Sequence, residues 1–166
     1  MRLSIKEIFK STHGSYVIEP ASEDVVATGL VWDSREVSEG CIYLALPGER
    51  VDGRVFVAQA FGKGAVCALV MGGVDEAAMD AARDSGLAII SVSNTYKAIE
   101  DLAAYWRGKL NGRVIGLSGS TGKTTTKNLV RDVLSAYGSV VATQGNQNNE
   151  IGVPKTLLSA EPDTTS

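Results

Sequence analysis

The chain has 166 residues, of which 44% are hydrophobic and 21% are charged, and its formal net charge is -3. This is the composition of an ordinary globular protein, and it lacks the basic excess that is typical of nucleic-acid binders. The N-terminal stretch has no continuous apolar segment of the kind found in signal peptides, and no apolar run reaches the roughly 18 residues that span a bilayer. We therefore expect a cytoplasmic protein that binds neither nucleic acid nor membrane.

The cysteine and histidine content argues against a metal centre with cysteine or histidine ligands. Cys41 and Cys67 each lie in an apolar run and are not at metal-ligand spacing, so we expect buried free thiols, which fit a reducing compartment. His13 is the only histidine and lies in a turn-like segment. We interpret it as a lone surface histidine and therefore expect neither a histidine-based zinc site nor a Ser/His/Asp triad.

Capping residues and apolar spacing predict alternating helices and strands. Ser4 and Glu7 form a capping box, which predicts a short helix through Phe9. Asn94 is a good N-cap for a further helix, whose apolar face consists of Ile99, Leu102, Ala103, Trp106 and Leu110. Other helices are predicted within residues 55–64, 75–86 and 123–138. Strands are predicted within residues 29–35, 41–46, 65–71, 87–92, 114–117 and 139–143.

This alternation predicts an α/β fold with a mixed or mainly parallel sheet. The best candidate boundary lies near Asn111. Residues 1–110 are numerous enough to bury a core of their own. Residues 111–166 contain a strand, a loop, a helix and a strand, and they resemble the start of a larger domain.

The most informative loop is Gly119-Ser120-Thr121-Gly122-Lys123-Thr124, followed by Thr125. It departs from the strict Walker A spacing, because five residues separate Gly116 from Gly122. Its glycines allow backbone N–H groups to point at an anion, and the helix after it offers a positive N-terminal end. Lys123 supplies a charge for phosphate and the Thr124 hydroxyl can ligate Mg²⁺. The alternative is a glycine-rich turn without function, but the flanking strand and helix favour phosphate binding.

A second polar cluster follows the predicted strand at residues 139–143. It contains Asn146, Asn148 and Asn149, whose amides suit hydroxyl, amide and phosphate oxygens. Ligands of parallel sheets bind at the carboxyl ends of strands. Asn and Gly also form turns, so composition alone leaves a plain turn equally open.

Two loops of the first half offer further ligands, which are Ser34, Arg35, Gly48, Asp52 and Gly53. Ser and Arg are natural partners of diphosphates and carboxylates, and the glycine-rich loop around Asp52 could face a base or a sugar. The residues alone favour the plainer interpretation, a capped turn with a surface ion pair.

Three segments together resemble the Mur ligase family of peptidoglycan synthesis. Residues 33–65 resemble the N-terminal substrate domain of these ligases, and GLSGSTGKTTTK is similar to their ATP loop, whose form is GxxGKT. The segment ATQGNQNNEIGVPKTLL resembles the branch that adds D-alanyl-D-alanine, which has a G-N-x-N-N-x-I-G-x-P run. The resemblance covers the chain from about Gly29 onward.

The resemblance implies an ATP-dependent ligase that uses Mg²⁺. It would phosphorylate the terminal carboxylate of a UDP-N-acetylmuramoyl-tripeptide, and D-alanyl-D-alanine would then displace the phosphate. Carried over to this chain, residues 119–125 form the ATP loop, with Lys123 as the catalytic residue and Thr124 as a metal ligand. The loops of the first half fall in the UDP-sugar region, and the asparagine run falls beside the muramoyl substrate.

Family members are much longer, and only 43 residues follow Lys123 (166 − 123). We therefore expect an inactive fragment that self-associates through an open sheet edge. Alternatives are a UDP-sugar-peptide-binding module with a vestigial nucleotide loop, and the sister ligase that adds the third amino acid. A small P-loop kinase or ATPase is disfavoured, because SVVATQGN ends without an acidic residue.

Overall fold

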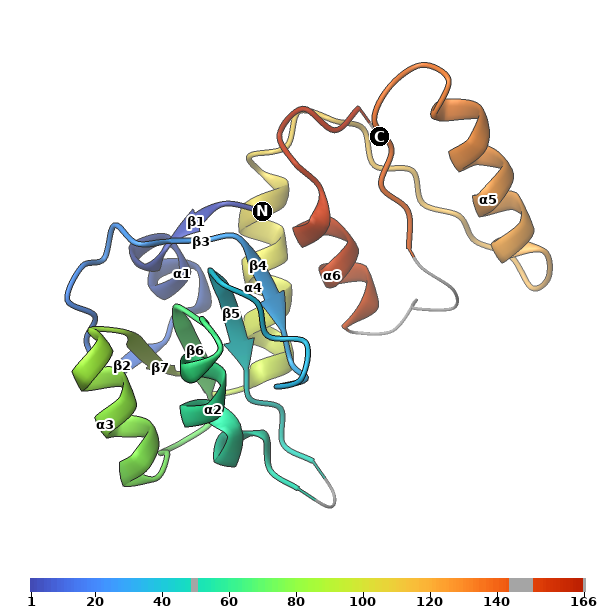
Figure 1. Cartoon of the computed structure of the whole chain (residues 1–166). Coiled ribbons are helices and arrows are strands. Elements are labelled where there is room, and N and C mark those ends of the chain that lie inside the picture. Colours follow the sequence, from blue (N-terminus) through green and yellow to red (C-terminus); the bar gives the residue numbers. More distant parts are fainter. Residues whose placement is uncertain (49–50, 144–150, 166) are drawn as a thin grey trace.

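The computed structural model describes residues 1–48, 51–143 and 151–165. They form an α/β fold, as predicted (Figure 1). The elements of the first half are β1 (Leu3–Ser4), α1 (Ile5–Thr12), β2 (Ser15–Ile18), β3 (Val26–Ala27), β4 (Gly29–Val31), β5 (Cys41–Leu44), the 3-10 helix η1 (Gly53–Phe56), α2 (Val57–Gly62), β6 (Cys67–Val70), α3 (Glu76–Ser85), β7 (Ala88–Ser91) and α4 (Thr95–Arg107). They are followed by α5 (Lys123–Leu134) and α6 (Gly152–Ser159).

The main sheet has the strand order β2-β7-β6-β5-β4. The pairs β4–β5, β5–β6 and β6–β7 are parallel, whereas β2 pairs antiparallel with β7, so the sheet is mixed. β1 and β3 form a separate antiparallel pair. Because β4, β5 and β6 run in the same direction, the loops that follow them meet at one edge of the sheet.

Helices cover both faces of this sheet. Ile42 and Leu44 of β5 pack in the cluster that contains the buried residues of α1 and α4, whereas Cys41 and Tyr43 pack in the cluster of α2 and α3. Burial on both faces explains why the central strands are continuous apolar runs. Cys41 and Cys67 are buried free thiols, as predicted, and they lie on opposite faces.

The helix caps were predictable from local sequence. The Ser4 hydroxyl accepts from the Glu7 amide and the Glu7 carboxylate accepts from the Ser4 amide, which confirms the capping box. The Asn94 side chain accepts from the amides of Tyr96 and Lys97, and the apolar face predicted for α4 is buried as far as Trp106.

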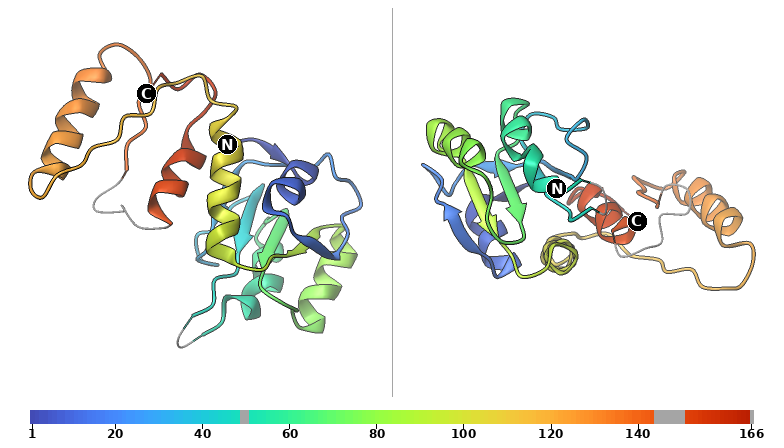
Figure 2. Two further views of the ribbon diagram at one scale, coloured as in Figure 1. Left: turned by 180° about the vertical axis from the view of Figure 1, so that it is seen from behind. Right: turned by 90° about the horizontal axis from the view of Figure 1, so that it is seen from below.

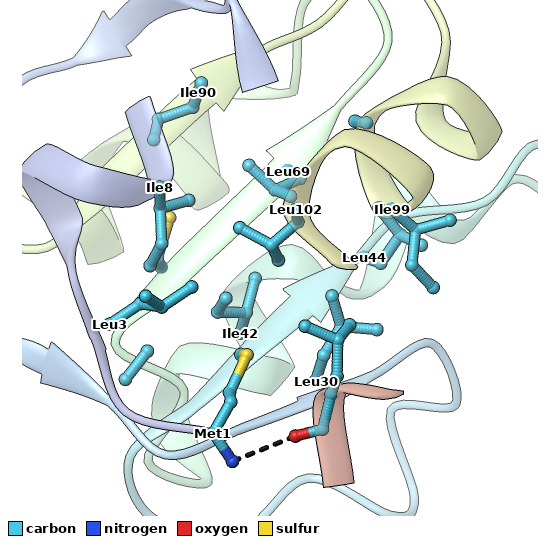
Figure 3. Close-up of a cluster of buried hydrophobic side chains, with 14 of the residues drawn as sticks. Met1, Leu3, Ile8, Leu30, Ile42, Leu44, Leu69, Ile90, Ile99 and Leu102 are labelled. Atoms are coloured by element: carbon cyan, nitrogen blue, oxygen red, sulfur yellow. Dashed lines mark hydrogen bonds between the residues drawn. The ribbon is translucent and has the colours of Figure 1, made fainter. Parts of the chain in front are cut away.

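Helix α6 was not predicted, and it packs against the first half of the chain. Leu158 lies in the core beside α4, and the Trp106 indole N–H donates to the Ala160 carbonyl across 2.9 Å. The Met1 amine donates to the Leu158 carbonyl at 2.9 Å, as the dashed line in Figure 3 shows. Pro154 fits in the first turn of α6, where its missing N–H costs nothing.

The strands predicted at residues 114–117 and 139–143 were wrong. Both segments are described by the structure, and both run as coil beside α5. Val114 and Ile115 remain 60% and 51% exposed. Apolar β-formers become a strand only when a neighbouring strand supplies a ladder of hydrogen bonds. Neither segment belongs to a described sheet, and 139–143 has one isolated backbone bond, from the Thr165 amide to the Ser139 carbonyl.

None of the helices in the described ranges combines the length and the apolar character needed to cross a membrane.

Candidate functional site

The loop after β4, residues 32–35, is named the front loop here. Within the front loop, the Arg35 guanidinium donates hydrogen bonds to the Asp33 carboxylate from Nε at 2.9 Å and from Nη2 at 2.6 Å. The hydrogen bonds from Arg35 hold the pKa of Asp33 down at about 2, so the pair stays charged. Within the described residues Nη1 of Arg35 makes no hydrogen bond, and its side chain is 85% exposed. The loop thus has the capped turn and surface ion pair of the plainer interpretation, and the Nη1 atom of Arg35 still offers donors to an anion.

Sequence reasoning missed Lys63, which supports the front loop. Lys63 is the C-cap of α2, and its Nζ donates to the carbonyl of the buried Ser34 across 2.8 Å. This contact joins residues 29 positions apart. No local sequence signal could have revealed it, because it depends on how α2 packs beside the end of β4.

The loop after β5 is held by a second Asp-x-Arg pair. Asp52 caps η1 by accepting from the Arg54 amide at 2.9 Å, and it also binds the Arg54 guanidinium at 2.7 Å. Arg54, which sequence reasoning also missed, donates to the carbonyls of Met71 and Gly73 after β6. A Cβ on Gly53 would lie 2.8 Å from the Leu46 carbonyl oxygen, so the close approach of these two backbone segments requires glycine. Gly48 is exposed in the same loop.

The two loops lie side by side, because they follow β4 and β5, which are neighbouring parallel strands. Burial, followed by the charges of Asp33 and Asp52, raises the pKa of Tyr43 to about 12. The Tyr43 hydroxyl donates to the Gly53 carbonyl across 2.9 Å. The structure therefore brings Ser34, Arg35, Asp52 and Gly53 to one edge of the sheet, as expected from parallel strands.

The predicted ATP loop lies at the start of α5. Gly122 is the N-cap with φ +75°, a conformation that favours glycine, and no side chain caps the helix. Lys123 Nζ donates to the Gly119 carbonyl, so the lysine folds over its own loop. A Cβ built on Gly116 or Gly122 would meet no atom within 4 Å. The loop is thus open, which fits the approach of a phosphate group to its backbone.

The donors around this loop fit magnesium only in part. Thr124 is exposed in the first turn of α5, where its hydroxyl would supply one oxygen ligand. No group of three or more His, Cys, Asp or Glu side chains gathers anywhere in residues 1–48, 51–143 and 151–165. Thr124 alone would therefore hold one position of a magnesium site.

A cavity of about 420 Å³ lies between residues 112–117, α5, residues 140–143 and α6. Its apolar lining includes Val114, Ile115, Val130, Leu134, Val140 and Leu157. Lys123, Lys127 and Arg131 follow one another at helical spacing along its wall. Lys127 Nζ donates to the Thr143 carbonyl, which connects α5 to the segment that leads toward the asparagine run.

Two parts of the predicted site are not brought together. In Figures 1 and 2, α6 stands between the sheet and α5, so the front loop and the ATP loop lie on separate sides of it. Asn146, Asn148 and Asn149 lie outside the described residues. The roles given to all these residues stay predictions.

Comparison with known proteins connects both halves of the chain to one family. The model described as "Mur ligase family, catalytic domain" matches residues 26–107, and the one described as "Mur ligase middle domain" matches residues 117–166. The chain therefore belongs to the Mur ligase family.

Within that family, the similar proteins are of the MurF type. A UDP-N-acetylmuramoyl-tripeptide--D-alanyl-D-alanine ligase from Synechocystis is 41% identical over 142 residues, which are 86% of this chain and 30% of the relative. The crystal structure of MurF from Acinetobacter baumannii superposes with a TM-score of 0.82 and 32% identity over 99% of this chain and 34% of that one. The MurF ligase from Thermotoga maritima, solved in complex with ADP, gives a TM-score of 0.64 and 32% identity over 81% of this chain and 30% of that one. The chain thus spans about a third of these proteins.

Proposed function

We propose that the whole protein is an ATP-dependent ligase that joins D-alanyl-D-alanine to the terminal carboxylate of a UDP-N-acetylmuramoyl-tripeptide. The observation that carries the proposal is the likeness to A. baumannii MurF over 99% of this chain, which includes both candidate loops. The sister ligase that adds the third amino acid shares the first-half motifs, but the relatives described above favour the dipeptide ligase.

The chemistry follows from the proposed site. The tripeptide carboxylate would take up a phosphoryl group to give an acyl phosphate, and the dipeptide amine would then attack the carbonyl and release phosphate. ATP supplies the phosphoryl group. Lys123 would stabilise the negative charge of the phosphoryl group during its transfer, and the backbone amides at the start of α5 would orient that group. Thr124 would hold one ligand position of Mg²⁺.

The first half of the chain would hold the UDP-sugar portion of the substrate. Arg35 pairs with Asp33 through Nε and Nη2, and its Nη1 donors would bind a diphosphate or a carboxylate. Asp52 shapes the neighbouring loop. We further propose that the chain alone does not turn over, because its described residues supply only a partial magnesium site.

Isothermal titration of UDP-N-acetylmuramoyl-tripeptide into this chain tests the proposal. We expect saturable binding that Arg35→Ala weakens about tenfold or more, the size of a charge-assisted hydrogen bond. Arg2→Ala is the matched control, because Arg2 is exposed and its side chain makes no hydrogen bond or ion pair within the described residues. Absence of binding, or equal binding by Arg35→Ala and Arg2→Ala, would contradict the proposed role of this loop.

A further inference from the structure

Cations from three elements contact the front loop, each at a different residue. Arg35 binds Asp33 within the loop, and Lys63 from the end of α2 donates to the Ser34 carbonyl. Lys155 from α6 places its Nζ 4.3 Å from the centroid of the Trp32 ring. Lys155 is the member that comes from the second half of the chain, more than 100 residues beyond the loop.

The charge of Lys155 is not neutralised by this contact. The face of an indole ring attracts a cation but carries no net charge. Across the described ranges, neither Lys63 nor Lys155 makes an ion pair, whereas Asp33 already pairs with Arg35. Asp33 chiefly, through its hydrogen bonds and its charge, and Glu36 to a smaller extent, through its charge, raise the pKa of Arg35. Counting the described residues named here, three cations, Arg35, Lys63 and Lys155, outnumber the two carboxylates, Asp33 and Glu36, which suits an anionic ligand.

Helix α6 holds Lys155 in a defined place. Its carboxyl end is fixed by the Met1 amine on the Leu158 carbonyl and by Trp106 on the Ala160 carbonyl, both at 2.9 Å. Leu158 is buried in the core. Lys155 itself is half-buried, so it differs from a solvated surface lysine. The Trp32 ring thus rests against a lysine whose helix is anchored elsewhere.

We propose that Lys155 is a positioning residue that fixes Trp32, and with it the front loop, against α6. This inference rests on the proposed function, in which the front loop binds the UDP-linked substrate. Ligand binding at the loop would then also stabilise the docking of α6 on β4. Because such coupling is reciprocal, loss of the Lys155 contact weakens ligand binding at the front loop. Ligand binding then no longer stabilises the docking of α6.

The test compares this chain with Lys155→Met, Lys155→Arg and the control Lys6→Met. Lys6 is exposed, and its side chain makes no hydrogen bond, ion pair or ring contact within the described residues. UDP-N-acetylmuramoyl-tripeptide is titrated by calorimetry, and amide exchange is followed for residues 152–159 with and without it. We expect Lys155→Met to weaken binding about fivefold, the size of a cation–π contact, and to abolish the ligand-induced protection of α6. Lys155→Arg, which keeps the cation, retains both properties.

The outcomes separate this inference from the proposed function. Binding and α6 protection in Lys155→Met equal to those of the unchanged chain would overturn the inference alone. A lower Tm of Lys155→Met with unchanged affinity would also overturn it, because the contact would then be structural only. Absence of binding by the unchanged chain would contradict the proposed function and this inference together.

Discussion

Glu7 shows how one residue joins local and long-range structure. Its carboxylate accepts from the Ser4 amide at 2.9 Å, and also from the Tyr105 hydroxyl at 3.1 Å and Lys109 Nζ at 2.6 Å. Burial raises the pKa of Glu7, but the hydrogen bonds from Lys109, Ser4 and Tyr105 outweigh it and lower the pKa to about 2. The capping half of this arrangement was predictable from sequence. The contact with Lys109, 102 residues away, was not.

The lowered pKa of Glu7 predicts a pH dependence of stability. The pKa in the folded state lies below the ordinary value of 4.5, so the stabilisation is complete above pH 4.5 and is lost as the pH falls toward about 2. From pH 5 to pH 3 the free energy of unfolding of the unchanged chain should fall by about 1 kcal/mol more than that of Glu7→Gln, since the partly exposed ion pair is screened by water. Urea denaturation at the two pH values measures this.

Glu100→Gln serves as the control for that experiment. The Glu100 carboxylate makes one long ion pair, 3.8 Å to Lys97 on the surface of α4. The free energy of unfolding of Glu100→Gln should depend on pH in the same way as that of the unchanged chain. An equal loss of stability on acidification in Glu7→Gln and in the unchanged chain would contradict the role given to Glu7.

At the scale of elements, sequence predicted what local chemistry determines. Helices α1 and α4 have side-chain caps and regular apolar faces, and both formed where expected. Strands β1, β2 and β3 were missed, because each includes exposed or half-buried positions and lacks the fully buried apolar run that marks β5 and β6. Segments 114–117 and 139–143 carry the composition of strands, but pairing depends on a partner strand, which local sequence does not report.

Helix α5 has an apolar face that is only half covered. Leu129, Val130, Val133 and Leu134 fall within about 140° of its circumference, counting 100° per residue, and Tyr137 follows in the turn after the helix. Val130 and Leu134 line the cavity, whereas Leu129 and Val133 are each 62% exposed and Tyr137 is 83% exposed. An apolar surface of this kind favours association.

This surface predicts self-association of the chain, through α5 and not through the sheet edge expected from sequence. Sedimentation velocity over a concentration series should show association of the unchanged chain, and Leu129→Gln with Val133→Gln should reduce it strongly while preserving helix propensity. Val55→Gln, at a 57% exposed position on η1, is the control and should associate like the unchanged chain. A chain that is monomeric at every concentration would refute this prediction.

At the scale of the whole molecule, α6 joins the two matched regions of the Mur ligase family. It packs against α4 and β4 of the first half, while its lysine contacts the front loop. The candidate loops could be found from the sequence, because each motif consists of residues that are close together along the chain. The contacts of Lys63, Arg54 and Lys155 that hold these loops could be seen only in the structure, because each contact joins residues that are far apart in the sequence.

We propose that this chain supplies about a third of a working MurF-type ligase. The most direct test replaces the matching part of the Synechocystis relative with residues 1–166 and measures phosphate release and ligated product with ATP, Mg²⁺, UDP-N-acetylmuramoyl-tripeptide and D-alanyl-D-alanine. We predict turnover of about 1 per second or faster that requires both substrates, and a loss of about 100-fold or more in Lys123→Met. A folded chimera that binds the UDP-linked substrate without turnover would contradict the claim and favour a binding module.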